Sequence, residues 1–270
     1  MTLKGKTAII AGASRGIGKA IAKRFFKEGA DVIAIARNTN VLIHHEIRSY
    51  ENLNKLITWP CDVSQEEEVK KAFDFIDNRL NRKVDILVNA AGIAEPYAPI
   101  FESEFSEWKK VFETNVFGTF LMMKYAILQM RENKSGKIIN FSGGGDGLEG
   151  FSAYSASKVA IVRLTETVAK EVKPFGIDVN VIAPGPLKTR LFYEMFFSKA
   201  FLQSKKTPPA TGDMQKSVEL ALFLASDKSN GLSGKFLSAN WDNWEKIPEN
   251  LNLIMSDPNV FTLRRVKGEI

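Results

Sequence analysis

A tyrosine and a lysine four residues apart are the first side chains in the sequence with catalytic potential. Tyr154 and Lys158 stand in the run Tyr-Ser-Ala-Ser-Lys at the start of an expected helix. Residues four apart share one helix face, so the ammonium group lies beside the phenol. A phenol has a reference pKa of about 10, and a nearby positive charge stabilises phenolate, so the pair can exchange a proton near neutral pH. Such a pair also occurs on solvated helix faces, and other motifs must decide between the two interpretations.

A glycine-rich turn precedes the first amphipathic stretch. Gly12, Gly16 and Gly18 follow an apolar run in the segment Ala-Gly-Ala-Ser-Arg-Gly-Ile-Gly. Glycine permits a tight turn and close backbone approach, and a helix N-terminus offers free N–H groups and the positive end of its dipole. The turn therefore predicts a site for the diphosphate of a dinucleotide, with simple packing of the turn as the alternative.

Two arginines near this turn indicate which dinucleotide is preferred. Arg37 follows the second apolar run, where an NAD site normally has an acidic residue for the ribose 2′-hydroxyl. Arg15 lies within the glycine turn itself. Two guanidinium groups near that ribose favour a 2′-phosphate, so the expected cofactor is NADP, with NAD possible. The alternative is that one or both side chains are merely solvated.

The elements that position these residues alternate along the chain. Short β-branched runs alternate with longer amphipathic stretches, which is typical of a parallel sheet covered by helices on both faces. The expected strands cover residues 7–11, 31–36, 57–60, 86–89, 137–141, 178–183 and 235–239. The expected helices cover residues 18–28, 65–80, 106–131, 153–173 and 213–225. We predict a doubly wound parallel sheet, Rossmann-like, in three α/β/α layers, with residues 1–270 as a single domain.

Two segments fall outside this alternation. Residues 190–212 are rich in phenylalanine and follow a strand end, where open α/β sheets bind ligands, so they are expected to form a substrate lid. The alternative is an amphipathic helix that packs on its own domain. Residues 241–270 form a C-terminal extension with no strong helical period. Its aromatic residues predict docking, either as an oligomer contact or as a wall of the substrate pocket.

Taken in order, these motifs resemble those of the short-chain dehydrogenase/reductase family, in its compact single-domain branch. The resemblance covers residues 4–239 and rests on Gly12-x-x-x-Gly16-x-Gly18, Asp62-Val63, Asn89-Ala90-Ala91-Gly92, Asn115, Tyr154-x-x-x-Lys158 and Pro184-Gly185. It implies a Rossmann-like fold that binds NAD(H) or NADP(H). It also implies hydride transfer between the nicotinamide and a small-molecule carbonyl or alcohol substrate.

The resemblance assigns individual roles. Tyr154 is the acid/base, Lys158 lowers its pKa and holds the nicotinamide ribose, and Asn115 positions a water in a proton relay. Asp62 and Val63 contact the adenine, Asn89 to Gly92 support the cofactor, and Thr189 meets the carboxamide. Together with the residues argued above, the expected cofactor-binding set is Gly12, Ser14, Arg15, Gly16, Ile17, Gly18, Arg37, Asp62, Val63, Asn89, Ala90, Ala91, Gly92, Tyr154, Lys158, Pro184, Gly185 and Thr189. Judged by residue type alone, Asn115 is a poor helix former whose amide is either locally satisfied or has a specific bond to make.

The chain departs from the family pattern at the catalytic serine. Phe141 stands where that serine normally lies, and the usual serine pair becomes Ser142-Gly143. We expect Ser142 to take the role through a shortened loop, with Ser152 as a further hydroxyl. The alternative is that Gly143 marks a vacated site. That alternative fits a dinucleotide-binding regulatory or scaffolding homologue with weak or no hydride transfer, and a lyase or epimerase that uses bound cofactor transiently is a third possibility.

Composition excludes several classes of protein. The 270 residues contain 37 Lys+Arg and 31 Asp+Glu, and a net charge of +6 spread along the chain does not favour nucleic acid. The sole cysteine, Cys61, cannot form an intrachain disulfide, which favours a reducing compartment. No long apolar segment predicts a signal peptide or membrane span, so we expect a cytoplasmic protein without membrane contact.

The sequence also bears on metal binding and on assembly. His44 and His45 have no cysteine or carboxylate cluster in a metal-ligand pattern, so no metal site is predicted. The helices expected over 106–131 and 153–173 resemble the subunit-contact pair of the family. We therefore predict a homodimer or homotetramer.

Overall fold

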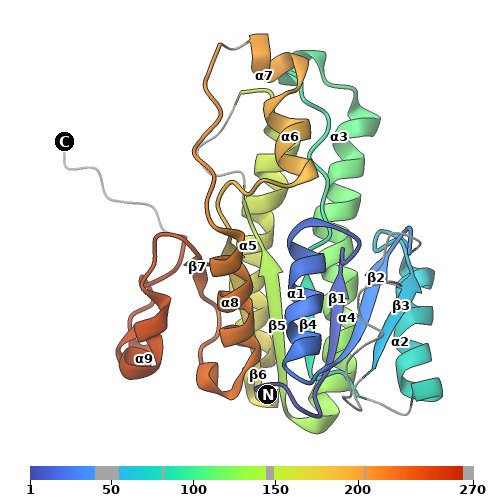
Figure 1. Ribbon diagram of the computed structural model, residues 1–270, viewed down its shortest axis with the longest axis vertical. Coiled ribbons are helices and arrows are strands. Elements are labelled where there is room, and N and C mark those ends of the chain that lie inside the picture. The colour runs from blue at the N-terminus through green and yellow to red at the C-terminus, as the bar shows by residue number, and fades with distance from the viewer. Residues whose placement is uncertain (40–54, 81–82, 144–148, 204, 264–270) are drawn as a thin grey trace.

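The protein is built around a parallel sheet (Figure 1). The computed structural model describes residues 1–39, 55–80, 83–143, 149–203 and 205–263. Within these residues the sheet has seven strands in the order β3-β2-β1-β4-β5-β6-β7. The strands are β1 (Thr7–Ala11), β2 (Asp31–Ala36), β3 (Leu56–Pro60), β4 (Ile86–Asn89), β5 (Gly136–Phe141), β6 (Ile177–Ala183) and β7 (Phe236–Ser238). The order reverses between β1 and β4, which confirms the predicted doubly wound, Rossmann-like sheet and places its ligand crevice at the carboxyl ends of these two strands.

Alternation along the strands divides the apolar residues between two layers. In β1, Ala8 and Ile10 pack toward α1 (Gly16–Lys27) and α8 (Met214–Ala225). Ile9 packs on the opposite face, toward the other helical layer. Strands covered on both sides must be apolar throughout, and every residue of β1 is buried.

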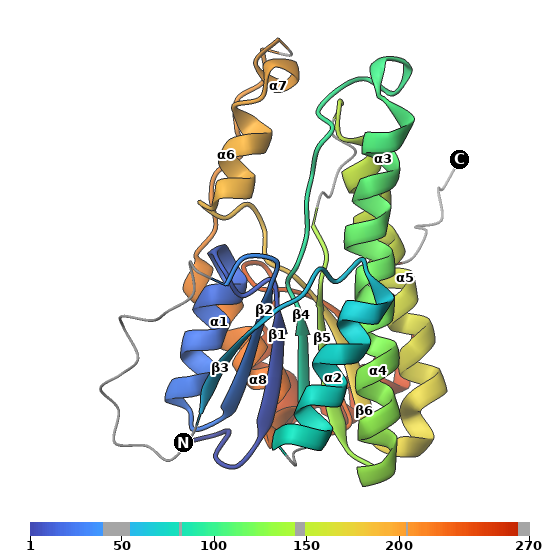
Figure 2. The same cartoon turned by 90° about the vertical axis from the view of Figure 1, so that its right-hand side faces the viewer.

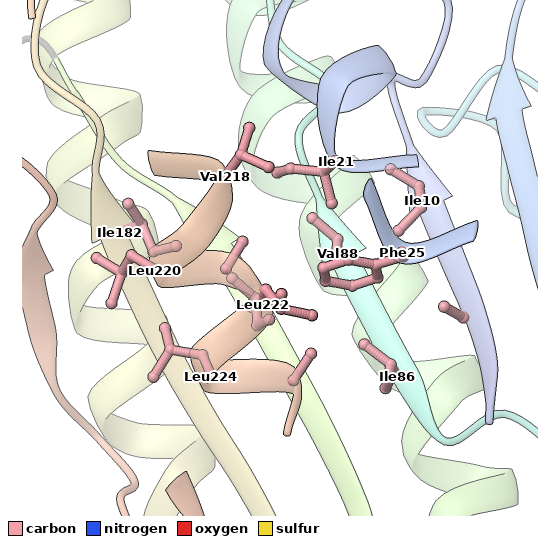
Figure 3. Packing of buried hydrophobic residues seen from close by; sticks show 14 of the residues in the cluster. Ile10, Ile21, Phe25, Ile86, Val88, Ile182, Val218, Leu220, Leu222 and Leu224 are labelled. Carbon is pink, nitrogen blue, oxygen red and sulfur yellow. The ribbon is translucent and has the colours of Figure 1, made fainter. Parts of the chain in front are cut away.

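Helices cover each face of the sheet (Figure 2). The second layer consists of α2 (Glu66–Leu80), α4 (Gly118–Asn133) and α5 (Ser152–Val172). In the first layer, Ile21 and Phe25 of α1 are four residues apart on one helix face and lie near Val218 of α8 (Figure 3). Each such fully buried side chain contributes about 1.5–3 kcal/mol to folding. This packing holds the glycine turn, which opens α1, against the sheet edge.

The long helix expected over 106–131 is interrupted by a wider turn. It consists of α3 (Phe105–Phe112), a π-helical turn (Glu113–Phe117) and α4. Asn115 lies in this π turn and is completely buried. π turns occur frequently at functional sites, because the inserted residue re-aims a side chain.

The segment expected to form a lid contains two short helices beyond the carboxyl edge of the sheet. They are α6 (Arg190–Phe196) and α7 (Lys199–Gln203), and Figures 1 and 2 show them standing above the strands. The side chain of Thr189 caps α6 by accepting a hydrogen bond from the backbone N–H of Phe192 at 3.3 Å. The remaining single-turn helices are η1 (Ile100–Glu102), η3 (Lys173–Phe175), η4 (Asp227–Ser229) and η5 (Trp244–Lys246).

The C-terminal extension contains a helix that the sequence pattern did not predict, α9 (Ile247–Ser256). Its apolar period is obscured by Pro248 in the first turn and by non-helical backbone angles at Asn250. The ammonium group of Lys235 is buried and donates to the carbonyls of Ile254, Asp257 and Val260 at 2.8, 3.2 and 2.9 Å. These bonds dock the extension on the body of the protein, and its expected part in an oligomer contact or in the substrate pocket stays a prediction.

Candidate active site

Tyr154 and Lys158 lie on one face of α5, as their spacing predicts. Both side chains are buried, and the Nζ atom of Lys158 lies 5.7 Å from the centroid of the Tyr154 ring. The same Nζ donates to the backbone carbonyl of Phe141 at the end of β5, at 3.1 Å. The lysine is therefore held between the Tyr154 phenol and the carboxyl edge of the sheet.

Burial shifts the pKa values of both groups toward their neutral forms. It raises the pKa of Tyr154 to about 12 and lowers the pKa of Lys158 to about 8. The shift of Tyr154 is opposite to the lowering expected from Lys158, because desolvation is its only cause. At neutral pH the phenol is consequently protonated, which is the form required of a proton donor.

Asn115 fixes the backbone next to this pair. Its Oδ1 accepts from the N–H of Ile93 at 2.9 Å, and its Nδ2 donates to the Ile93 carbonyl at 2.9 Å. Nδ2 also donates to Oγ of Ser157 on α5 at 2.9 Å. The amide thus has the specific bonds that its unfavourable position in a helix suggested, and it joins the loop after β4 to the helix carrying Tyr154.

The structure does not place Ser142 where a second donor to the reacting oxygen is needed. Its Oγ donates to the carbonyl of Lys158 at 3.0 Å. A Cβ atom added at Gly143 would instead lie 3.0 Å from the Tyr154 hydroxyl. These contacts do not favour the role expected for Ser142, which stays a prediction: successive side chains near a strand end point to opposite sides, and position 143, which has no side chain, faces the phenol. Oγ of Ser152 accepts a hydrogen bond from Nε1 of Trp108 at 3.2 Å, a bond that does not use its own proton.

A cleft opens at the carboxyl ends of β1, β2 and β4. Twelve of the expected cofactor residues line it: Gly12, Ser14, Arg15, Gly16, Ile17, Arg37, Asp62, Val63, Ala90, Ala91, Gly92 and Thr189. The sequence analysis missed seven lining residues: Ile35, Ala36, Cys61, Ile93, Thr114, Arg190 and Leu191. Each lies within two positions of a predicted site residue, at a strand end, in the π turn or at the start of α6, so extending each motif by one or two positions would have found them.

Six expected cofactor residues lie outside the lining of the cleft, and two of them are Tyr154 and Lys158 themselves. An added Cβ at Gly18 would lie 2.4 Å from the carbonyl oxygen of Gly12, so this glycine is required for packing of helix against turn. Nδ2 of Asn89 donates to Oδ1 of Asn140 on the neighbouring strand at 2.8 Å. The remaining two belong to the Pro184-Gly185 turn, whose Pro184 carbonyl accepts from Nδ2 of Asn240 at 2.7 Å.

Lys158 approaches the cleft at Gly92. An added Cβ at this position would lie 3.4 Å from both Nζ of Lys158 and Oδ1 of Asn115. Gly92 lines the cleft, so the absence of a side chain there keeps the path from cleft to lysine short. The Tyr154–Lys158 pair and the predicted dinucleotide site are therefore parts of one site.

The diphosphate end of the cleft has the electrostatic character that a dinucleotide requires. Arg15 is the N-terminal cap residue of α1, no side chain caps the helix, and its first turn contains no acidic residue. Its N–H groups and dipole are thus available to an anion. Arg15 and Arg37 are both exposed and both line the cleft. The residues present therefore fit a dinucleotide diphosphate and, near the end of β2, an additional phosphate.

An aromatic cluster packs around Tyr154 on the lid side. Helix α6 contributes Phe192, Met195 and Phe196 to it, α7 contributes Phe201, and Phe151 lies just before α5. Tyr97 and Leu191 pack against these buried side chains. The rings of Phe192 and Phe196 are 4.7 Å apart, and those of Phe196 and Phe201 are 4.9 Å apart. The side of Tyr154 that faces this cluster is consequently apolar.

The described part of the chain lacks a metal-binding cluster and a membrane-spanning helix. No group of three or more histidine, cysteine or acidic side chains there is suited to holding a metal ion. His44 and His45 lie outside the described residues. None of the described helices combines the length and apolar character needed to cross a bilayer.

Comparisons with known proteins agree with this geometry. A family model described as short chain dehydrogenase matches residues 6–197. The chain is 30% identical over 255 residues to an NADPH-dependent aldehyde reductase-like chloroplastic protein of Arabidopsis thaliana, with 89% of this chain and 94% of that protein covered. It is 35% identical over 244 residues to secoisolariciresinol dehydrogenase of Forsythia intermedia, with 86% of each covered. A gluconate 5-dehydrogenase from Burkholderia cenocepacia J2315, solved with NADP and tartrate, matches with a TM-score of 0.78 at 29% identity and covers 88% of this chain and 94% of its own. The chain therefore belongs to the short-chain dehydrogenase/reductase family of NAD(P)-dependent oxidoreductases.

Proposed function

We propose that the protein reduces a small carbonyl compound with NADPH, or oxidises the corresponding alcohol with NADP⁺. The observation that carries this proposal is the position of Lys158, whose Nζ lies 5.7 Å from the Tyr154 ring and borders the cleft at Gly92. The ammonium group of Lys158 therefore lies between the proton donor, Tyr154, and the dinucleotide site. When bound, the dinucleotide supplies or accepts the hydride.

The residues of this chain divide the remaining work. Tyr154 gives its proton to the carbonyl oxygen during reduction and removes it during oxidation. Lys158, when protonated, holds the nicotinamide ribose and stabilises the phenolate. Asn115 keeps the Ile93 backbone and Ser157 in place and serves the relay that returns a proton to the site.

NADP preference is supported by charge. Arg15 and Arg37 line the cleft, and β2 ends without an acidic residue that would bind a ribose 2′-hydroxyl. Guanidinium groups bind phosphate through charge-assisted, often bidentate hydrogen bonds. The names of the Arabidopsis relative, which is NADPH-dependent, and of the Burkholderia structure, which holds NADP, point in the same direction.

The aromatic cluster indicates the kind of substrate. Residues 190–212 act as a lid, and Phe192 and Phe196 bring apolar surface to Tyr154. A carbonyl carried on an apolar or aromatic body gains from burial against these rings, whereas a polyhydroxylated or anionic substrate loses hydration against them. We propose an apolar aldehyde or ketone as the substrate class.

The decisive experiment is a panel of apolar and polyhydroxylated aldehydes and ketones, each incubated with the purified chain and NADPH while absorbance of the reduced cofactor is recorded. Turnover of apolar members that disappears in Tyr154→Phe supports the proposal. If NADPH binds but no carbonyl is reduced, the alternative is favoured: a dinucleotide-binding regulatory homologue, which the missing side chain at Gly143 would fit.

A further inference from the structure

We propose that Tyr97 donates the second hydrogen bond to the reacting carbonyl oxygen, in place of the side chain that Gly143 lacks. This inference rests on the proposed carbonyl reduction. Tyr97 lies in the loop between β4 and η1, outside every motif that the sequence analysis identified.

The hydroxyl of Tyr97 makes no hydrogen bond to the described residues. Its oxygen is nevertheless buried. Burying a hydroxyl without a partner costs free energy, and such a group often marks a functional site. A ligand oxygen placed beside the phenol would satisfy it.

The second argument is location. Tyr97 packs against the aromatic cluster that includes Tyr154, and its ring centroid lies 5.5 Å from that of Phe151. The backbone is fixed there as well, since the N–H of Ala98 donates to the carbonyl of Gly150 at 3.0 Å. The loop that carries Tyr97 is thus attached to the segment that leads into the catalytic helix.

The third argument is protonation. The pKa of Tyr97 is raised, mainly by burial. The negative charges of Glu194 and Glu95 add to this effect, and the Tyr154 phenol makes the smallest contribution. The phenol of Tyr97 therefore keeps its proton throughout the working pH range. During reduction the hydride reaches the carbonyl carbon, Tyr154 transfers its proton to the oxygen, and Tyr97 retains its own proton while sharing it in a hydrogen bond.

Other hydroxyl groups near the site are less suitable. Ser142 already donates its proton to the backbone carbonyl of Lys158, and Oγ of Ser152 has a partner in Nε1 of Trp108, whereas the Tyr97 hydroxyl has none among the described residues. Oγ of Ser155 is also buried without a partner in the described structure, but Ser155 follows Tyr154 directly on α5, and adjacent residues on a helix do not face one another. Tyr97 is the hydroxyl that combines an unmet hydrogen bond with a place in the cluster around Tyr154.

The test is Tyr97→Phe, which removes a single oxygen atom and keeps the ring. We expect kcat for the best apolar carbonyl to fall about 10²- to 10³-fold, the usual effect of losing one preorganised donor. The affinity for NADPH, measured by calorimetry, should not change. The thermal midpoint should be equal or higher, because an unsatisfied buried hydroxyl is removed. Tyr125→Phe makes the same change where the hydroxyl contacts exposed Glu66, and it should leave all three values as in the wild type.

Three outcomes are distinguishable. A lower kcat with unchanged NADPH affinity and an undiminished midpoint supports the role of Tyr97. A kcat within twofold of wild type overturns it and leaves the proposed function intact, and a fall in kcat that accompanies a lower midpoint also overturns it, because the hydroxyl would then be structural. If the wild-type chain reduces no carbonyl at all, the proposed function fails first and this role falls with it.

Discussion

Oγ of Ser142 donates a hydrogen bond to the backbone carbonyl of Lys158 at 3.0 Å, so the serine nearest the catalytic position supports the helix that carries the lysine. A hydroxyl bound in this way is not available to a substrate. The space in front of the Tyr154 hydroxyl adjoins Gly143 instead. The contact makes a clear prediction about the kinetic role of Ser142.

Ser142→Ala should retain most of the wild-type turnover rate, because it removes a bond to the backbone and not a bond to the substrate. The free energy of unfolding should fall by about 0.5–1.5 kcal/mol, the typical net value of one hydrogen bond. Steady-state kinetics and denaturant titration measure the two effects, with Tyr154→Phe as the inactive reference. If turnover instead slows by about 10²-fold or more at unchanged stability, Ser142 is restored as the polarising donor.

Arg37→Ala should weaken NADPH binding and leave NADH binding nearly unchanged. One charge-assisted contact to the 2′-phosphate contributes about 1.5–3 kcal/mol, which corresponds to a rise in Kd of about 10- to 150-fold. Calorimetric titration with both cofactors gives the ratio directly. Lys216→Ala, a lysine remote from the cleft on exposed surface of α8, is the control. An equal loss for both cofactors, or a wild-type preference for NADH, would show that Arg37 does not read the phosphate.

The activity should decrease as pH rises through about 8. Burial lowers the pKa of Lys158 to about 8, so its ammonium is charged below this pH and neutral above it. Tyr154, with a pKa of about 12, stays protonated across the same range. The value of kcat/KM for NADPH reports groups of the free enzyme, and its logarithm should fall above that pH. Lys158→Met should be slow at every pH and lack this step, and a wild-type profile that stays flat well above the pKa of the lysine would contradict the role of the charge.

The protein should assemble through the face formed by α3, the π turn and the neighbouring helices. Phe105, Phe117, Phe120 and Val159 expose large apolar side chains there, with exposed fractions of 75%, 50%, 48% and 47%. Packing α5 against α3 and the π turn brings these elements together. Burying such a patch against a second copy would stabilise a homodimer or homotetramer.

The combined change Phe117→Glu and Phe120→Glu should convert the oligomer into a monomer in sedimentation experiments. Leu253→Glu places one glutamate on α9, where the leucine is 69% exposed, and should leave the assembly unchanged. A wild-type chain that sediments as a monomer at micromolar concentration would refute the prediction.

The sequence by itself determined the sheet and most of the dinucleotide cleft. β1, β2 and β4 begin and end where their apolar runs predict, because strands buried on both faces must be almost continuously apolar. The glycine turn and the Tyr154–Lys158 pair followed from local spacing, since backbone conformation and helix periodicity depend on neighbouring residues.

Only the tertiary structure decided the side-chain partners. Ser142 and Gly143 are adjacent in the sequence, yet only the strand end and its contact with α5 determine which of them faces Tyr154. Tyr97 carries no local signal, and its unmet hydrogen bond appears when loop, lid and α5 enclose its hydroxyl. The helix α9 was hidden by Pro248 and Asn250, and bonds from Lys235, far away in the sequence, hold its end in place. Contacts between distant segments are set by packing. The local sequence pattern around each residue does not reveal them.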